Sequence, residues 1–173
     1  EPAGNEIDAD ITGYVFSPYV YGGYADGGTA TVPYNTNGNE VSITYSNTTQ
    51  LGYYGSVYGG FTDYGDASGN QVSITGAALT GNDMVTTNLE LVGEGVNGGT
   101  TNNGNADNNT VALDHVTINS QMIRSLSMPG VIGGSVLTWS MSSTPATLAD
   151  GTVSTSASGN KVTLTDSVVT NSV

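Results

Sequence analysis

Apolar and polar residues alternate in four short segments of the chain, and each segment follows an asparagine. The segments share the pattern Asn-x-Val-x-Ile/Leu, with an apolar residue at every second position. This period is typical of a half-buried β-strand, and β-branched residues favour strands. The residues expected to face one interior are Val41 and Ile43, Val72 and Ile74, Val111 and Leu113, and Val162 and Leu164. The residues expected to face outward are Ser42, Ser73, Ala112 and Thr163.

A Gly-Gly pair precedes each of these segments, so the segments belong to an internal repeat. The first glycines stand at positions 22, 59, 98 and 133, which are 37, 39 and 35 residues apart. Such a period, with short strands and no amphipathic helix, predicts stacked coils whose equivalent strands pair at about 4.8 Å. The spacing leaves open whether one repeat forms one large coil or two smaller ones.

Glycine and asparagine are expected to shape the corners of these coils. We expect the Gly-Gly and Gly-Asn pairs to supply positive φ angles where the chain turns. The asparagines that begin the four segments are expected to stack as a ladder, which comprises Asn39, Asn70, Asn109 and Asn160. Polar stretches near 95–109 and 140–151 are predicted to be irregular insertions, because they contain few apolar residues.

The predicted fold is all-β: a right-handed parallel β-solenoid of imperfect 35–39 residue repeats, forming one elongated domain over residues 1–173. A hydrophobic content of 36% suits a narrow continuous core. The alternative is an antiparallel β-sandwich of the fibre-subunit kind, built from the same alternating strands. Stacking of Val41, Val72 and Val111 in neighbouring coils distinguishes the two folds, because only the solenoid places them in one column.

All ten tyrosines lie in the N-terminal part of the chain, residues 1–64. Two interpretations remain open for them. They form stacked ladders that support the fold, or they form an exposed surface that contacts a glycan or a protein, since tyrosine binds partners at low entropic cost. The residues considered for such a ligand surface are Tyr53, Tyr54, Tyr58 and Tyr64.

The charge balance excludes several classes of partner. Two basic residues, Arg124 and Lys161, stand against fifteen acidic ones, which gives a formal net charge of −13. A nucleic-acid surface needs many basic residues, and an anionic membrane would repel this chain. There is no stretch of 18 apolar residues, so we expect no membrane insertion of this segment. The near absence of lysine resists trypsin-like proteases, which fits a secreted or cell-surface location.

The chain contains few residues of the types that usually catalyse reactions. His115 is the only histidine and is predicted to be a solvated strand residue, and no nucleophile-elbow motif is present. Glycoside hydrolysis needs two carboxylates facing one cleft. Spacing alone suggests two such pairs, Asp63 with Asp66 and Glu90 with Glu94. Acidic residues at glycine-rich corners could form a weak calcium site without a recognised calcium motif, and they are Asp26, Asp63, Asp66 and Asp107. We therefore expect a non-enzymatic protein without cofactor or bound metal.

The tandem arrangement of Val-Tyr-Gly-Gly (20–23, 57–60) with a downstream Gly-Asn-x-Val-x-Ile-Thr (38–44, 69–75) suggests a family. It resembles the repeat arrays in passenger regions of autotransporter-like and related large surface proteins of Gram-negative bacteria. Two good copies and two degraded copies cover most of the chain. The resemblance implies a right-handed parallel β-helix that serves as an adhesin or a surface fibre.

The C-terminal segment continues as a strand pattern to the last residue, without a polar capping segment. An unpaired strand edge is a template for another strand. We therefore expect head-to-tail self-assembly into an extracellular fibre, with an adhesin fragment that binds host glycan or protein as the alternative. The residues predicted to form the self-assembly interface are Val162, Leu164, Val168 and Val169.

Overall fold

The computed structural model describes residues 4–11, 19–29, 31–45, 52–76, 89–91, 95–121, 130–136 and 156–172. These residues form thirteen β-strands and, within the described ranges, no helix. The strands are β1 (Glu6–Ile11), β2 (Tyr19–Ala25), β3 (Glu40–Tyr45), β4 (Gly52–Tyr54), β5 (Ser56–Tyr64), β6 (Gln71–Thr75), β7 (Leu89–Leu91), β8 (Val96–Asn103), β9 (Thr110–Asp114), β10 (Val116–Gln121), β11 (Val131–Val136), β12 (Lys161–Thr165) and β13 (Val168–Ser172).

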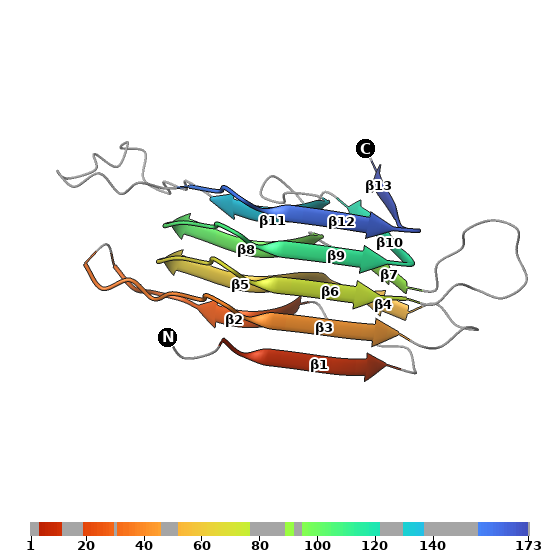
Figure 1. Ribbon diagram of the computed structural model, residues 1–173, viewed down its shortest axis with the longest axis horizontal. Coiled ribbons are helices and arrows are strands. Elements are labelled where there is room, and N and C mark those ends of the chain that lie inside the picture. Colours follow the sequence, from red (N-terminus) through yellow and green to blue (C-terminus); the bar gives the residue numbers. More distant parts are fainter. Residues whose placement is uncertain are drawn as a thin grey trace, which may run out of the picture.

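The strands form three sheets, and every strand pairing is parallel. The five-stranded sheet has the order β1-β3-β6-β9-β12, and the four-stranded sheets have the orders β13-β10-β7-β4 and β11-β8-β5-β2. Figure 1 shows the five-stranded sheet rising from β1 to β12. The antiparallel β-sandwich considered as the alternative fold is therefore wrong, because its strands would pair in opposite directions.

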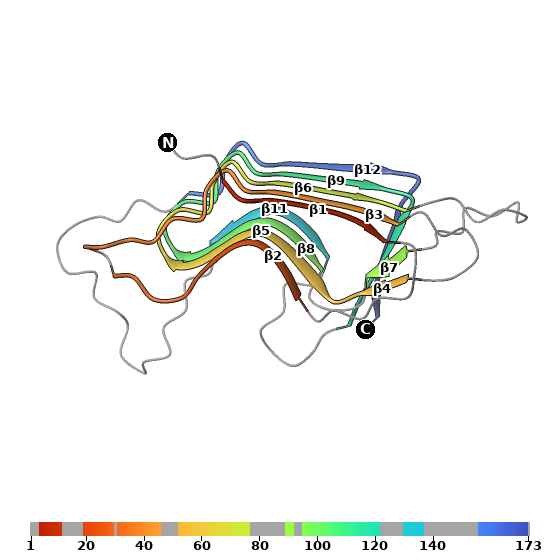
Figure 2. The same cartoon turned by 90° about the horizontal axis from the view of Figure 1, so that it is seen from below.

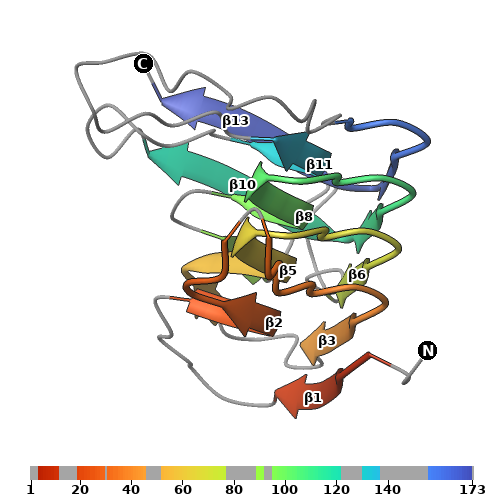
Figure 3. The same cartoon turned by 90° about the vertical axis from the view of Figure 1, so that its left-hand side faces the viewer.

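The chain visits the three sheets in turn. From β3 it passes through β4 and β5 and returns to the first sheet as β6, directly beside β3. Figure 2 shows the straight strands of the five-stranded sheet on one side and the curved strands β2, β5, β8 and β11 facing them. Figure 3 shows the same layers stacked from β1 to β13. One repeat is therefore one coil with a strand in each sheet, which answers the question that the repeat spacing left open.

The aliphatic columns predicted from the alternating pattern are confirmed. Val41 pairs with Val72, which pairs with Val111, and all three side chains are buried. The neighbouring column runs Ile43, Ile74 and Leu113 in the same register, also buried. These columns form one continuous core with Val57, Val96, Val116 and Ile118 from the other two sheets. Burial of such side chains, at roughly 1.5–3 kcal/mol each, is the main stabilising contribution available to a chain without disulfides.

The predicted asparagine ladder is also confirmed, and its geometry is more specific than the prediction. The side-chain oxygen of Asn70 accepts two hydrogen bonds from Asn39, one from its backbone N–H at 2.9 Å and one from its Nδ2 at 2.8 Å. Asn109 accepts the same two bonds from Asn70, and Asn160 accepts them from Asn109. The ladder therefore satisfies buried amides at every coil.

The Gly-Gly pairs do not lie at corners, which corrects the prediction. They lie inside β2, β5, β8 and β11, and none has a positive φ angle. The second glycine of each pair packs on the asparagine ladder: a Cβ at Gly60 would lie 2.7 Å from Nδ2 of Asn70, and a Cβ at Gly99 would lie 2.7 Å from Nδ2 of Asn109. These strands contain glycine because their backbone lies directly against the asparagine side chains, across a narrow core.

The Gly-Asn pairs do mark corners, as predicted. Gly38, Gly69 and Gly159, each preceding a ladder asparagine, have φ angles of 68°, 69° and 65°. The third repeat has Asn108 at the equivalent place, with φ of 56°. Asparagine tolerates this left-handed conformation better than most residues with a side chain, so the corner is kept where the glycine is missing.

The stretch 95–109 is not an insertion, which corrects a second prediction. Residues Val96–Asn103 form β8, which pairs with β5 on one side and β11 on the other. Thr100 and Thr101 are buried within it, and Thr101 Oγ1 donates to the carbonyl of Gly65 at 2.8 Å. Parallel pairing needs only backbone groups, so a polar sequence forms a strand between two neighbours. The other predicted insertion, 140–151, lies outside the described residues.

Candidate self-association site

The C-terminal end of the stack exposes the next residues of the buried columns. On β12, Val162 pairs with the buried Val111 and is 41% exposed, and Leu164 pairs with the buried Leu113 and is 47% exposed. On β13, Val169 pairs with the buried Ile118 and is 38% exposed. These three residues of the predicted interface therefore lie together at one end, and each continues a core column that has no further coil above it among the described residues.

Val168, the fourth predicted interface residue, takes a different register position. It pairs with Thr117, one residue before the Val169–Ile118 pair. Successive residues of a strand alternate between faces, so the core column of β13 continues through Val169. The side chain of Val168 lies outside the described part of the structure.

The N-terminal end of the stack is formed by β1, which the sequence prediction missed. Its residues Glu6 to Ile11 pair in parallel with Glu40 to Tyr45. The signal was present in the sequence, because Gly4-Asn5-Glu6-Ile7 repeats Gly38-Asn39-Glu40-Val41 in residue type. Asn5 donates its backbone N–H to Oδ1 of Asn39 at 3.1 Å and so begins the ladder.

The two ends of the asparagine ladder are chemically unlike. Each ladder residue donates toward the C-terminal end and accepts from the N-terminal end. Among the described residues, no hydrogen bond uses the N–H or the Nδ2 group of Asn160 as donor, and none uses Oδ1 of Asn5 as acceptor. The C-terminal end of the ladder therefore has donors without a partner among the described residues, and the N-terminal end begins with the backbone N–H bond of Asn5.

Aromatic side chains form stacked rows on β2 and β5. Tyr21 stacks on Tyr58 with ring centroids 5.0 Å apart and planes 14° apart, and Tyr24 stacks on Phe61 at 5.5 Å and 10°. Tyr19 adds to the first row, 5.9 Å from Tyr21. These rows follow the strand-to-strand direction, because Tyr21 pairs with Tyr58 and Tyr24 with Phe61 in the sheet. The rings support one another, which fits the ladder interpretation of the tyrosines.

The four tyrosines predicted as a ligand surface do not form one patch. Tyr58 is only 7% exposed beneath its aromatic neighbours, so it supports the surface and does not form it. Tyr64 is 38% exposed. The side chains of Tyr53 and Tyr54 lie outside the described residues. Three tyrosines that were not predicted for this surface are exposed, and they are Tyr19, Tyr24 and Tyr34.

His115 lies at a turn and not in a strand, which corrects its predicted position. It has a φ angle of 53° between β9 and β10, and Asp166 occupies the aligned turn of the next coil with φ of 43°. Nδ1 of His115 lies 2.6 Å from Oδ1 of Asp114, and Nε2 lies 3.8 Å from Oδ2 of Asp166. Asp114, His115 and Asp166 are the one group in the described ranges whose ligand-type atoms are close enough to share an ion. No local sequence signal points to this group, since 51 residues separate its two turns.

The acidic residues considered as calcium ligands have other roles in the structure. Asp63 accepts a hydrogen bond from Asn102 Nδ2 at 2.7 Å. Asp66 accepts from the N–H of Asn105 at 2.8 Å. These carboxylates tie one coil to the next, Asp63 from within β5 and Asp66 from the corner that follows it. Over the described part of the chain they do not gather around a common point with Asp26 or Asp107.

Asp107 is the most strongly bonded of these corner carboxylates. Ser156 donates its hydroxyl to Oδ2 at 2.5 Å, and Ser158 donates its N–H to Oδ1 at 2.7 Å. The hydroxyl of Ser158 adds a third bond to Oδ1 at 3.1 Å. These bonds, chiefly that from the Ser156 side chain, lower the pKa of Asp107 against a small opposing effect of burial. The negative charge of Asp107 is therefore part of the corner structure.

The chain matches no protein-family model, no curated protein sequence and no solved structure. None of the described residues belongs to a helix long and apolar enough to cross a membrane. The functional proposal therefore rests on the side-chain columns and the two open ends of the stack.

Proposed function

We propose that this protein is an extracellular structural subunit, a right-handed parallel β-solenoid that self-assembles end to end into a surface filament. The observation that carries the proposal is the exposure of Val162 and Leu164, which continue two buried core columns at the outer edge of the stack. Right-handed winding follows the strong preference of parallel strand connections for that hand.

Association at the end of the stack would form backbone hydrogen bonds and bury apolar side chains. An unpaired parallel edge exposes N–H and C=O groups that another strand satisfies. Covering apolar residues there removes them from water at about 25 cal/mol per Å². A contact between unlike ends does not close by twofold symmetry, so each addition leaves a new open end and the assembly grows as a filament.

An extracellular, non-enzymatic role agrees with the composition. The core is held by columns of side chains and by hydrogen-bond ladders, which need neither cysteine nor reducing conditions. Two tryptic sites in 173 residues limit cleavage by trypsin-like proteases. The net charge of −13 keeps the sides of neighbouring filaments apart, while the C-terminal end exposes the apolar side chains of Val162 and Leu164.

The test is substitution of the exposed column residues. In Val162→Asp and Leu164→Asp, a carboxylate replaces the apolar side chain at the contact, so filament growth by the purified chain should be lost in electron micrographs. Circular dichroism and urea unfolding should show a folded monomer, because both side chains are exposed in the single chain.

The matched control is Val32→Asp, which makes the same substitution at a residue that is 58% exposed far from β12. This variant should form filaments like the unaltered chain. The proposal fails if the unaltered chain stays monomeric at high concentration, or if the Val162 and Leu164 variants polymerise normally.

The alternative function, an adhesin fragment that binds host glycan or protein, is favoured by one observation. Tyr19 and Tyr24 are about half exposed beside the aromatic rows of β2 and β5. An adhesin should bind cells or a glycan array saturably, and Tyr24→Ala should weaken that binding. Tyr34→Ala, at a comparably exposed tyrosine outside the rows, is the control. Absence of saturable binding by the unaltered chain removes the alternative.

A further inference from the structure

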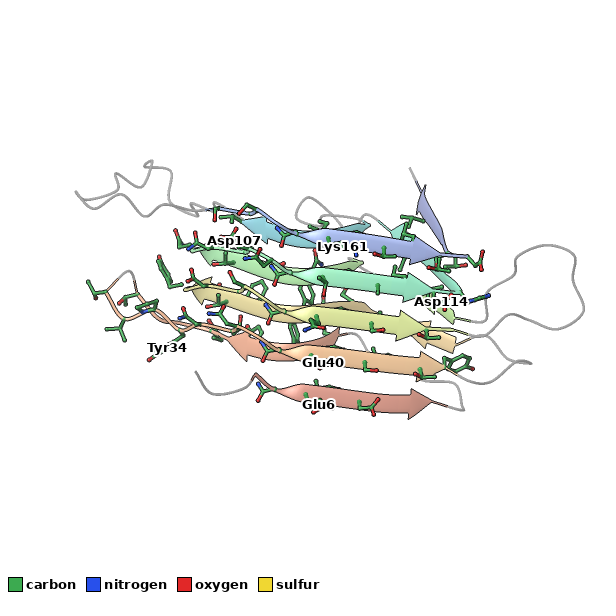
Figure 4. The ribbon with its side chains drawn as sticks, viewed as in Figure 1. Glu6, Tyr34, Glu40, Asp107, Asp114 and Lys161 are labelled. Carbon is green, nitrogen blue, oxygen red and sulfur yellow. The ribbon has the colours of Figure 1, made fainter. Side chains whose placement is uncertain are left out.

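The outward face of the five-stranded sheet carries opposite charge at its two ends. One column of aligned residues runs Glu6, Glu40, Gln71, Thr110 and Lys161 from β1 to β12. It begins with two acids and ends with one of the two basic residues in the whole chain. Figure 4 shows Glu6, Glu40 and Lys161 following one another up this face. Glu6 and Lys161 are both exposed.

The residues beside Glu6 and Lys161 extend this difference. Asp8, also exposed, aligns with Ser42, Ser73, Ala112 and finally Thr163. The N-terminal edge is therefore acidic, while the C-terminal edge carries a lysine and neutral residues. Like charges directly opposite one another on neighbouring strands destabilise pairing, and opposite charges stabilise it.

The asparagine ladder, like the charges, differs between the two ends of the sheet. Among the described residues Asn160 accepts two ladder bonds and donates none, and Asn5 donates its N–H to Oδ1 of Asn39 and accepts none. At every coil the residue after the ladder asparagine donates its N–H to the asparagine carbonyl one coil below, as Lys161 does to Asn109 at 2.9 Å. The carbonyl of Asn160 would accept the same bond from Glu6 of an added chain.

We propose that the partner of the C-terminal edge is the β1 edge of a second copy, paired in parallel so that Lys161 lies beside Glu6 and Asn160 beside Asn5. This inference rests on the end-to-end assembly proposed above and specifies its register. In that register Val162 covers Ile7, and Leu164 meets the position of Ala9, so the core columns continue across the junction.

This register confines the junction to one sheet. Among the described strands, the five-stranded sheet has one more strand than each of the other two. When β1 of the added copy lies one strand spacing from β12, β2 of that copy lies two spacings from β11. The contact is therefore small, and assembly requires high protein concentration.

Charge exchange tests the register. Lys161→Glu places two acids opposite one another, and Glu6→Lys places two lysines opposite one another. Each change should raise the concentration needed for assembly roughly tenfold, measured by sedimentation. The double variant with both exchanges keeps the composition and net charge of the native chain and should assemble like it. An equimolar mixture of the two single variants should also assemble, since each then supplies the end that the other lacks.

Glu40→Lys is the matched control, because it changes the net charge as Glu6→Lys does but lies one strand inside the edge. Lower net charge alone would favour assembly of both variants. Specific pairing predicts that only Glu6→Lys assembles worse than the native chain.

Engineered thiols test the alignment directly, because the chain has no cysteine. In the double variant Asp8→Cys with Thr163→Cys, the two positions lie opposite each other across the junction at about 4.8 Å, within disulfide range. Oxidation should give a ladder of linked chains on a non-reducing gel. The control, Asp10→Cys with Thr163→Cys, is displaced by two residues to about 8 Å and should not link.

The outcomes separate the two proposals. Linking of the Asp8→Cys pair and not of the Asp10→Cys pair, together with rescue by the double charge exchange, supports the register. Assembly of the native chain without charge rescue, or with linking of the Asp10→Cys pair, overturns the register and leaves end-to-end assembly standing. A native chain that stays monomeric at high concentration overturns both.

Discussion

The side chain of Asn70 illustrates how single residues hold the coils together. It accepts two hydrogen bonds from Asn39 and donates, with its own N–H and Nδ2, to Asn109. It is fully buried, so water cannot replace these bonds. Its role depends on an amide that accepts and donates at once, which no aliphatic side chain reproduces.

Asn70→Ala should therefore destabilise the fold strongly. It leaves the buried N–H of Asn39 without an acceptor, at about 1–3 kcal/mol, and removes one of the two acceptors of Asn39 Nδ2, which still donates to the carbonyl of Thr36 at 2.9 Å. Urea unfolding should show a total loss of roughly 2–5 kcal/mol. Asn160→Ala removes the same two accepted bonds from Asn109 at the exposed end and should cost less than half as much, since water reaches that end. Equal losses would contradict the role of burial.

The ionisation of Asp107 makes the stability of its corner depend on pH. Its folded pKa lies below the ordinary value because serine donors stabilise the carboxylate. A carboxylate with a depressed folded pKa contributes stability above its unfolded pKa, near 4, and the contribution disappears as pH falls through the folded pKa. Ser156→Ala should raise the pKa of Asp107 toward the ordinary value and reduce the stability lost on acidification.

An NMR titration of the Asp107 carboxyl checks this expectation. Ser167→Ala, at a corner serine that does not contact Asp107, is the control and should leave the titration unchanged. An unchanged pKa in the Ser156 variant would show that its hydroxyl does not govern this carboxylate.

Among the elements, the Gly-Gly strands and the ladder strands depend on each other. Gly23, Gly60, Gly99 and Gly134 each bring a strand backbone against a ladder asparagine. The curved sheet can approach the five-stranded sheet this closely only where no Cβ stands between them. Both halves of the repeat are therefore one structural feature, although about ten or more residues separate them in sequence.

Two substitutions distinguish a glycine that is required by lack of space from one that is required by a positive φ angle. They are Gly60→Ala and Gly69→Ala. A Cβ at Gly60 would lie 2.5 Å from the carbonyl oxygen of Thr36 and 2.7 Å from Nδ2 of Asn70, so this change should cost roughly 2–3 kcal/mol by overpacking. Gly69 has φ of 69°, and a Cβ there would have no atom within 4 Å, so Gly69→Ala should cost about 1 kcal/mol through backbone strain alone. Thermal or urea unfolding measures both, and the reverse ranking would contradict the packing explanation.

Across the full stack, parallel pairing gives the protein two unlike ends. Every coil has the same direction, so the donors and acceptors of the ladder are repeated with one polarity from β1 to β12. A twofold dimer would bring identical edges together, with donors facing donors at the ladder. Head-to-tail contact in the five-stranded sheet instead places Lys161 beside Glu6, which is why the charge-exchange and aspartate variants are the decisive experiments for the assembly.

Short-range signals along the chain were enough to specify several elements. The alternation of apolar and polar residues indicated which side chains of β3, β6, β9 and β12 face the core columns. The internal repeat indicated which residues of these strands pair with one another. The aliphatic columns and the asparagine ladder were therefore predictable. The Gly-Asn corners were predictable too, because positive φ selects glycine or asparagine locally. The missed strand β1 carries the same motif in its first residues and was within reach of the same reasoning.

The remaining features depend on folding in three dimensions, because their causes lie between residues distant in sequence. Val96–Asn103 has little apolar content and becomes a strand through its neighbours β5 and β11. The Gly-Gly pairs owe their place to asparagines on the opposite sheet, and His115 meets Asp166 only through the stacking of two turns. The alignment of Glu6 and Lys161 in one column at opposite edges likewise arises from the order in which the coils stack.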